Sequence, residues 1–276
     1  MLLGNQNIQN YFESLIEGDH LSHAYLFYGP EGVGKRLCAQ KISEKLAGLF
    51  KNNPDLRVID KGIDEITISE IRELKNFIHL TPFGKYKIVI INNAHNLGRD
   101  ASNALLKILE EPPGRSVLFL ISHLPKLLLP TVLSRCQLIR FKPLKESEIL
   151  NYLISLSKAS GYPNERRVTS EVAEYSAKFA NGSLGQALEL AENFDNFQKN
   201  INLLNRLIKS EFVERFEAVK KISVKEDLKK IVNDWFIYSA SLPEKKLARE
   251  LLRLNNILSK SQFSQKLALD NFLVRL

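Results

Sequence analysis

A glycine-rich turn between an apolar run and a helical pattern limits most strongly what this chain can fold into. Residues 29–35 have the sequence GPEGVGK and follow the apolar run 24–28. Such a turn exposes successive backbone N–H groups beside a helix N-terminus, so phosphate oxygens are stabilised there. The pattern predicts a phosphate-binding loop, in which the lysine reaches the outer phosphates. Its candidate binding residues are Gly29, Gly32, Gly34 and Lys35.

Three positions near this loop lack the side chains that nucleotide hydrolysis needs. Arg36 stands where a Ser or Thr hydroxyl would hold Mg²⁺, and it cannot ligate a cation. The apolar run 87–91 ends in Asn92 and Asn93, where a metal-binding Asp and a catalytic Glu are expected. Because hydrolysis needs a metal ion and an oriented water, we expect nucleotide binding at most, with no metal. The Arg36 guanidinium would supply positive charge in place of Mg²⁺.

The first half of the chain alternates short apolar runs with helical patterns, which is typical of a parallel sheet covered by helices. The sequence therefore predicts an α/β P-loop domain. The expected strands are 24–28, 56–59, 87–91, 117–122 and 138–141, and the expected helices are 34–49, 68–80 and 100–110.

The strand pattern ends near Pro143, and the remainder of the chain is helical in pattern. We predict three domains: an α/β domain (1–143), a small helical domain (144–192) and an all-helical C-terminal domain (193–276). The small domain has expected helices at 146–157, 170–180 and 184–192, with turns at 161–164 and 181–183. The apolar stripes of the third domain, such as Leu247, Leu251, Leu254 and Leu258, indicate the core of a helical bundle.

The composition says more about the compartment in which the protein works than about the reaction it takes part in. The chain has two cysteines, Cys38 and Cys136, which supports neither zinc ligation nor a disulfide framework. We find no apolar segment long enough to span a bilayer and no export signal, so we expect a cytoplasmic protein without a membrane partner. The net charge of +8 suits work close to nucleic acid, but it fits equally well with solvated helix faces such as Lys220-Lys221 and Lys229-Lys230.

Four segments carry a resemblance to a known family. They are NALLKILEEPP (103–113), LSRC (133–136), SHAYLF (22–27) and TPFGKYK (81–87). Together they closely resemble AAA+ clamp-loader subunits of the bacterial replicative DNA polymerase. The resemblance implies an AAA+ fold for residues 1–143, a lid for 144–192 and an oligomerisation collar for 193–276.

The resemblance also implies roles for individual positions. Gly185 stands where hydrolysing subunits carry a lid arginine that senses the terminal phosphate. The sensor position at the end of another strand falls at Ser122 or His123. Arg135, in the LSRC segment, would be an arginine finger presented to ATP on the neighbouring subunit; a surface arginine in a local salt bridge is the alternative. The four-cysteine zinc module of some family members has no counterpart in residues 47–56, so zinc is not expected.

The chain lacks the metal ligand, the base and the sensor arginine of the hydrolysing subunits, and in this it resembles the family member that does not hydrolyse ATP. The resemblance implies a stator that requires no cofactor and holds ATP or ADP at most passively. Implied partners are the gamma/tau ATPase subunits and the delta subunit, with the sliding clamp and primer-template DNA reached through the complex. Two alternatives stay open. One is a divergent active AAA+ ATPase of the gamma/tau type, with Glu110 or Glu111 as a displaced base. The other is a dedicated nucleic-acid-binding module.

Overall fold

The computed structural model describes residues 3–47, 53–158, 168–211, 214–215, 217, 228–243, 245–258 and 265–275. The chain divides into two compact units, one made of residues 1–148 with 182–185 and the other of residues 149–181 with 186–276. Three predicted features lie outside the described residues: the turn at 161–164, the last residues of the helix expected at 34–49, and the pair Lys220-Lys221. The predicted division into three domains stays a prediction.

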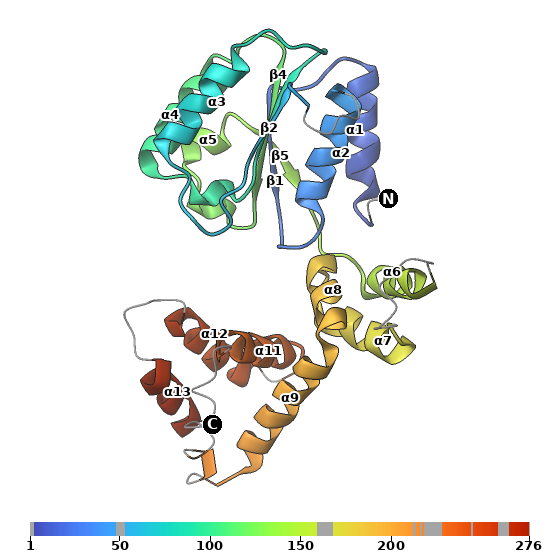
Figure 1. The fold of residues 1–276 in the computed structure, drawn as a ribbon, viewed down its shortest axis with the longest axis vertical. Coiled ribbons are helices and arrows are strands. Elements are labelled where there is room, and N and C mark those ends of the chain that lie inside the picture. Colours follow the sequence, from blue (N-terminus) through green and yellow to red (C-terminus); the bar gives the residue numbers. More distant parts are fainter. Residues whose placement is uncertain are drawn as a thin grey trace. The chain divides into compact units, whose positions relative to one another are not determined.

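The first unit is a five-stranded parallel sheet in the order β2-β3-β4-β1-β5, with helices on both faces (Figure 1). This confirms the predicted α/β architecture with a parallel sheet. The strands are β1 (Ala24–Tyr28), β2 (Leu56–Ile59), β3 (Lys87–Ile91), β4 (Ser116–Ser122) and β5 (Gln137–Arg140).

Helices α1 and α2 cover one face of the sheet, and α3, α4 and α5 cover the other (Figure 1). Their bounds, with those of two 3₁₀ turns, are α1 (Gln6–Glu17), α2 (Lys35–Ala47), α3 (Ile68–Ile78), η1 (Ala94–Asn96), α4 (Arg99–Glu110), η2 (Pro125–Leu127) and α5 (Pro130–Leu133). The sequence patterns did not predict α1.

Successive side chains of a strand point to opposite faces of the sheet, so each face has its own hydrophobic core. Tyr25 and Phe27 of β1 point to the α1 side, where Phe12 packs edge-on against both rings. Leu26, between them, joins the cluster on the α3 and α4 side. Burial on both faces explains why the central strands have nearly continuous apolar sequences.

The sheet register brings distant chain segments to one edge. In the parallel pairs, Tyr28 lies opposite Ser122, and Ile91 lies opposite Leu120. Residues that follow β1, β2, β3 and β4 therefore meet at the carboxyl ends of the strands, where ligands bind in open α/β sheets. The glycine-rich loop, Asp60, Asn92 and His123 are all brought to this edge.

The second unit is helical in its described part. Its core surrounds Trp235, which is fully buried and donates from Nε1 to the carbonyl of Asn200 at 2.7 Å. None of the described helices is both long and apolar enough to cross a membrane. In the part of the chain that the structure describes, the helices after β5 are α6 (Glu146–Lys158), α7 (Ser170–Phe179), α8 (Leu184–Glu192), α9 (Phe194–Lys209), α11 (Leu228–Ala240), α12 (Lys246–Leu258) and α13 (Gln265–Val274).

Replacing Asp234 with asparagine is expected to stabilise the second unit at neutral pH. The carboxylate is 6% exposed, and burial raises its pKa, although a hydrogen bond from Asn200 Nδ2 at 2.7 Å offsets part of that rise. A raised pKa means that folding favours the protonated acid, so the carboxylate costs stability as pH rises through that pKa. An asparagine oxygen can still accept from Asn200, and we expect a gain of about 0.5–2 kcal/mol.

The single tryptophan provides the measurement for this prediction. Trp235 lies in the second unit, so urea unfolding followed by its fluorescence reports on that unit. The gain of Asp234→Asn should shrink in acid, where the wild-type side chain becomes neutral as well. A gain that does not change with pH would show that relief of the buried charge is not its cause.

Candidate functional site

The loop between β1 and α2 has the backbone geometry that its glycines allow. Gly29, Gly32 and Gly34 have φ angles of 139°, 71° and 90°, which side-chain-bearing residues rarely adopt. At Gly32 space is also limiting, because a Cβ there would lie 2.1 Å from Ser183 Oγ. The predicted phosphate-binding loop therefore has a conformation that depends on its glycines.

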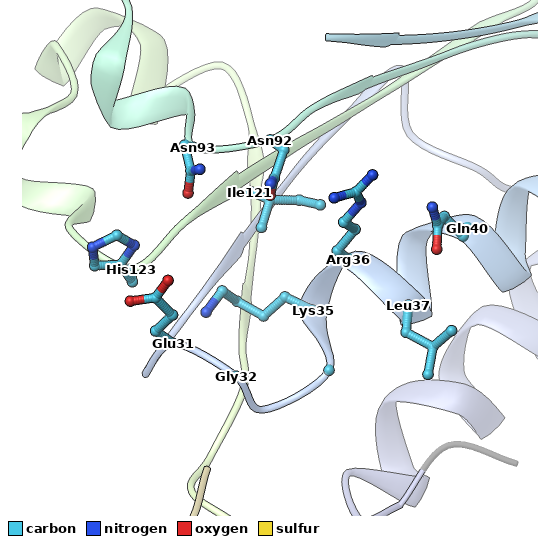
Figure 2. A pocket seen from close by; sticks show the side chains of 11 residues that line it. Glu31, Gly32, Lys35, Arg36, Leu37, Gln40, Asn92, Asn93, Ile121 and His123 are labelled. Carbon is cyan, nitrogen blue, oxygen red and sulfur yellow. The ribbon is translucent and has the colours of Figure 1, made fainter. Parts of the chain in front are cut away.

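A cavity of about 350 Å³ opens beside this loop, at the carboxyl edge of the sheet (Figure 2). The structure thus brings the loop together with the two asparagines that end β3 and with the residues that end β4. The lining residues are Glu31, Gly32, Gly34, Lys35, Arg36, Leu37, Gln40, Asn92, Asn93, Ile121 and His123.

Lys35 is folded back onto its own loop. Its side chain donates from Nζ to the Gly29 carbonyl at 2.8 Å and also to the Pro30 carbonyl, and the residue is only 6% exposed. Burial lowers the pKa of Lys35 to about 8, and the Glu31 carboxylate opposes part of that shift. Figure 2 shows the amine directed toward Glu31. A phosphate would have to replace the two carbonyl contacts and tolerate the negative charge of Glu31.

Arg36 is paired within the protein. Its Nη1 lies 2.5 Å from Asp60 Oδ2, and Asp60 follows β2 directly. The second oxygen of Asp60 accepts from Asn92 Nδ2 at 3.1 Å, and Asn93 Nδ2 donates to the Gly62 carbonyl at 2.9 Å. The corner of the site where a metal ion would be expected is therefore occupied by an internal ion pair and two amide side chains. The positive charge that the sequence predicted at Arg36 is compensated by Asp60.

The two candidate sensor residues at the end of β4 have different surroundings. Ser122 is fully buried, and its Oγ pairs with His95 Nδ1 at 3.2 Å and accepts from the Leu124 amide. His123 lines the cavity, whereas Ser122 does not. Of the two positions that the sequence left open, His123 is the one that shares the cavity with the glycine-rich loop.

His95 was missed by sequence reasoning. Its ring lies 4.3 Å from that of His123, centroid to centroid, in an edge-on arrangement. Burial lowers the pKa of His95, and the nearby His123 ring contributes to the shift. The available signal was its place two residues after Asn93, near the carboxyl end of a buried strand. His95 thus contacts both Ser122 and His123, although it does not line the cavity itself.

The segment 182–185 packs against the phosphate-binding loop. The Gly185 amide donates to the Gly32 carbonyl at 3.1 Å, and a Cβ on Gly185 would lie 3.3 Å from Gly32 Cα. Gly185 therefore lies against the loop at the position where the resemblance implied a sensing arginine. A larger residue there would require the loop to shift by a few tenths of an ångström.

Arg135 lies outside the cavity, in the turn after α5. Its Nη1 donates to the Thr131 carbonyl at 3.1 Å and to Ser134 Oγ at 3.3 Å, and its Nη2 lies 2.8 Å from Glu110 Oε1. The arginine side chain is 35% exposed. It does not line the cavity beside the glycine-rich loop, and neither do Glu110 and Glu111. The hypothesis that one of these glutamates is a displaced base for this cavity therefore has no support in the geometry.

The described residues contain no cluster of three or more His, Cys, Asp or Glu side chains arranged to hold a metal ion. Cys38 and Cys136 are buried free thiols, and burial raises the pKa of each to about 12. The absence of zinc and of a required cofactor stays a prediction.

Comparison with known proteins agrees with this geometry. Residues 4–145, just over half of the chain, match a family model described as DNA polymerase III, delta subunit. The chain is 34% identical over 197 residues to DNA polymerase III subunit delta' of Pseudomonas aeruginosa, covering 58% of this chain and 60% of that protein. It is 32% identical over 208 residues to DNA polymerase III subunit gamma of Buchnera aphidicola, covering 67% and 55%. The alignments thus span less than two thirds of these curated relatives.

A solved structure supports the fold alone. A DNA polymerase III gamma subunit-related protein of Thermotoga maritima has a TM-score of 0.55 at 19% sequence identity, covering 96% of this chain and 97% of that one. From the family model and the delta' relative, the chain belongs to the DNA polymerase III delta-subunit family, as a delta-prime-like member of the AAA+ clamp-loader proteins.

Proposed function

We propose that this chain is a hydrolysis-deficient subunit of the DNA polymerase III clamp loader. In this proposal it acts as a stator during sliding-clamp loading and presents Arg135 to ATP bound by a neighbouring subunit. One observation carries the proposal: the cavity beside the glycine-rich loop lacks the groups that hydrolysis needs, while Arg135 lies outside that cavity with about a third of its side chain exposed.

The side chains of the cavity explain the proposed loss of hydrolysis. Of its described lining residues, Glu31 alone has a carboxylate, and it stands on the loop where phosphates would bind. The nearby Asp60 is committed to Arg36 and Asn92. Because phosphoryl transfer needs Mg²⁺ on the outer phosphates and a group that orients water, losing both should reduce the rate by many orders of magnitude.

Nucleotide binding at this site would be passive and independent of metal. Lys35 and the loop amides can still contact phosphate oxygens. The one carboxylate among the described lining residues, Glu31, lies beside the Lys35 amine and away from Arg36, where Mg²⁺ would be expected (Figure 2). We expect the purified chain to bind ADP equally well with Mg²⁺ or with EDTA. Lys35→Ala should weaken binding roughly 10- to 100-fold, the usual value of one charged hydrogen bond. Isothermal titration calorimetry would measure both effects.

Lys41→Ala is the matched control for this measurement, since Lys41 lies on the same helix but does not line the cavity. Affinity that collapses on removal of Mg²⁺ would contradict passive, metal-free binding.

The proposed partners follow from the same relationship. They are the gamma/tau ATPase subunits and the delta subunit, with the sliding clamp and primer-template DNA reached through the complex. Mixing the chain with the loader ATPase subunits and determining the mass of the product tests this part. A chain that forms no complex with them would contradict the proposal.

An active ATPase of the gamma/tau type is the second candidate, favoured by the similarity to the Buchnera aphidicola gamma subunit. The two candidates differ in one measurement on the purified chain. An ATPase would release phosphate in a Mg²⁺-dependent reaction that Lys35→Ala abolishes. A stator would show the same background release with and without this substitution.

A further inference from the structure

The contact between Arg135 and Glu110 joins two elements that are separate in the sequence. Glu110 is the last residue of α4, and Arg135 follows the short helix α5. The two helices pack against each other, and the ion pair between the residues measures 2.8 Å. Glu110 has no part in the chain's own nucleotide cavity, so its carboxylate is available for another role.

The guanidinium is held from two sides. Nη1 donates to the Thr131 carbonyl and to Ser134 Oγ, both from its own turn, while Nη2 meets the Glu110 carboxylate across from α4. These three contacts use at most three of the five N–H donors of an arginine. Within the described part of the chain, this leaves donors that can bind a further acceptor. These contacts thus fix the guanidinium plane and still leave N–H donors of Arg135 for a further acceptor.

We propose that Glu110 is a positioning residue for Arg135, which orders the guanidinium before it meets the polyphosphate bound by the neighbouring subunit. This inference rests on the proposed function of Arg135. Holding an arginine in one rotamer matters because the unbound side chain loses considerable rotamer freedom when it is fixed. Glu110 sets this geometry in the free subunit, before the phosphate arrives.

The ion pair is too weak for Glu110 to keep Arg135 away from the neighbouring nucleotide, so a positioning role is favoured over an inhibitory one. Both side chains are more than a third exposed, at 35% for Arg135 and 49% for Glu110. An exposed ion pair of this kind shifts an equilibrium by at most about fivefold. A finger contact with a transferring phosphoryl group is worth roughly 10³- to 10⁵-fold in rate. The neighbouring nucleotide can therefore take the guanidinium from Glu110 easily.

The surroundings of Glu110 also limit repulsion of the incoming phosphates. Glu110 lines a surface cavity of about 310 Å³ together with Lys75, His79 and Lys107. The two lysines offset the negative charge of Glu110 and of Glu111 on the same cavity wall. A polyphosphate that approaches Arg135 would thus meet a carboxylate whose charge is compensated nearby.

The test uses the reconstituted clamp loader with single and double variants of this chain. In single-turnover experiments with clamp and primed DNA, we expect Glu110→Ala to slow hydrolysis at the bordering ATP site about fivefold, which is the most that an exposed ion pair contributes. The ATP concentration that gives the half-maximal rate should not change, because the neighbour binds the nucleotide. Glu110→Gln should restore most of the rate, since its amide oxygen can still accept from Nη2. Glu111→Ala is the matched control and should have no effect. The mass of each complex verifies assembly.

The double variant distinguishes positioning from an independent effect. If Glu110 acts through Arg135, adding Glu110→Ala to Arg135→Ala causes no further loss. A double variant slower than Arg135→Ala by the full Glu110 factor would overturn the inference. So would an unchanged or faster Glu110→Ala complex beside a slow Arg135→Ala complex, and that result would leave the proposed function intact. An Arg135→Ala complex with unchanged turnover would overturn both.

Discussion

Under the proposed function, replacing Arg135 with alanine is expected to slow hydrolysis at the neighbouring subunit's ATP site by roughly 10³- to 10⁵-fold. A guanidinium delivered to a phosphoryl group stabilises charge that develops in the transition state, and water cannot replace it in a closed site. Arg135 is suited to such delivery, because its side chain is partly exposed and anchored at Nη1 and Nη2, and because it does not line the cavity beside the glycine-rich loop. Assembly should not change, since the substitution removes only an exposed ion pair and two local hydrogen bonds.

The measurement should isolate the bordering site. A loader with several ATPase subunits has several ATP sites, and each contributes to steady-state turnover. We therefore expect Arg135→Ala to remove that site's share of the burst in a single-turnover experiment with clamp and primed DNA. Arg135→Lys should recover little, because a lysine keeps the charge but loses the planar fork that contacts two phosphate oxygens.

Arg57 offers a matched control for this experiment. It is also an exposed arginine in an ion pair with a glutamate, since its Nη2 lies 3.4 Å from Glu73 Oε2. Arg57→Ala should leave the burst unchanged. An Arg135→Ala complex with the full wild-type burst at saturating clamp and DNA would refute the finger assignment.

The central strands β1, β3 and β4 were predictable because they are buried on both faces. The apolar runs at β1, β2 and β3 predict the observed bounds, whereas β4 begins one residue earlier than predicted and β5 is displaced by one residue. Strand β5 is mostly exposed, with a single neighbour in β1, so its sequence has fewer apolar residues to mark its ends.

Helix α1 was missed although its sequence carries a helical pattern. Its apolar residues recur at three- and four-residue spacing, and all of them pack in or against the core on that face of the sheet: Ile8, Tyr11, Phe12, Leu15 and Ile16. The contacts of Phe12 with Tyr25 and Phe27 depend on the assembled sheet, so tertiary packing adds to the stability of this short helix.

The candidate site was predictable where one local motif defines it. Glycine spacing and the end of an apolar run were sufficient for the phosphate-binding loop and for Asn92 and Asn93. The pairing of Arg36 with Asp60 was not accessible, since it depends on the order β2-β3-β4-β1, which brings the residue after β2 to the edge that carries the loop. The ring contact between His95 and His123 likewise depends on the sheet order, because it joins the residues that follow β3 and β4.

Removing the carboxylate of Asp55 is expected to cost the first unit about 3–5 kcal/mol of stability, the usual effect of leaving one buried charge without its partner. Asp55 precedes β2, and Lys87 begins β3; their side chains are each 3% exposed and meet at 2.8 Å. The carboxylate also accepts from the Phe83 amide at 3.0 Å and from the Gly84 amide at 2.6 Å. Asp55→Ala would therefore leave an ammonium group and two amides without their acceptor.

The location of the single tryptophan makes this loss measurable within one molecule. Trp235 lies in the second unit, so its fluorescence does not report on the first, whereas far-UV circular dichroism follows both. Asp55→Ala should lower the urea midpoint of the dichroism transition and leave the fluorescence midpoint nearly unchanged. Asp64→Ala, at an exposed aspartate after the same strand, is the control and should change neither. Equal shifts by both probes would contradict an effect confined to the first unit.

The pH dependence of the Asp55 effect has a definite sign. Burial alone would raise the pKa of this carboxyl, but the hydrogen bonds from Lys87, Gly84 and Phe83 together hold it below its ordinary value. A depressed pKa in the folded state contributes stability that is fully present above the unfolded value of about 3.9 and is lost as pH falls through the folded value. The difference between wild type and Asp55→Ala should therefore be constant near neutrality and narrow only below about pH 4. Adding Lys87→Met to Asp55→Ala should recover part of the loss, because it removes the buried charge that the first substitution leaves unpaired.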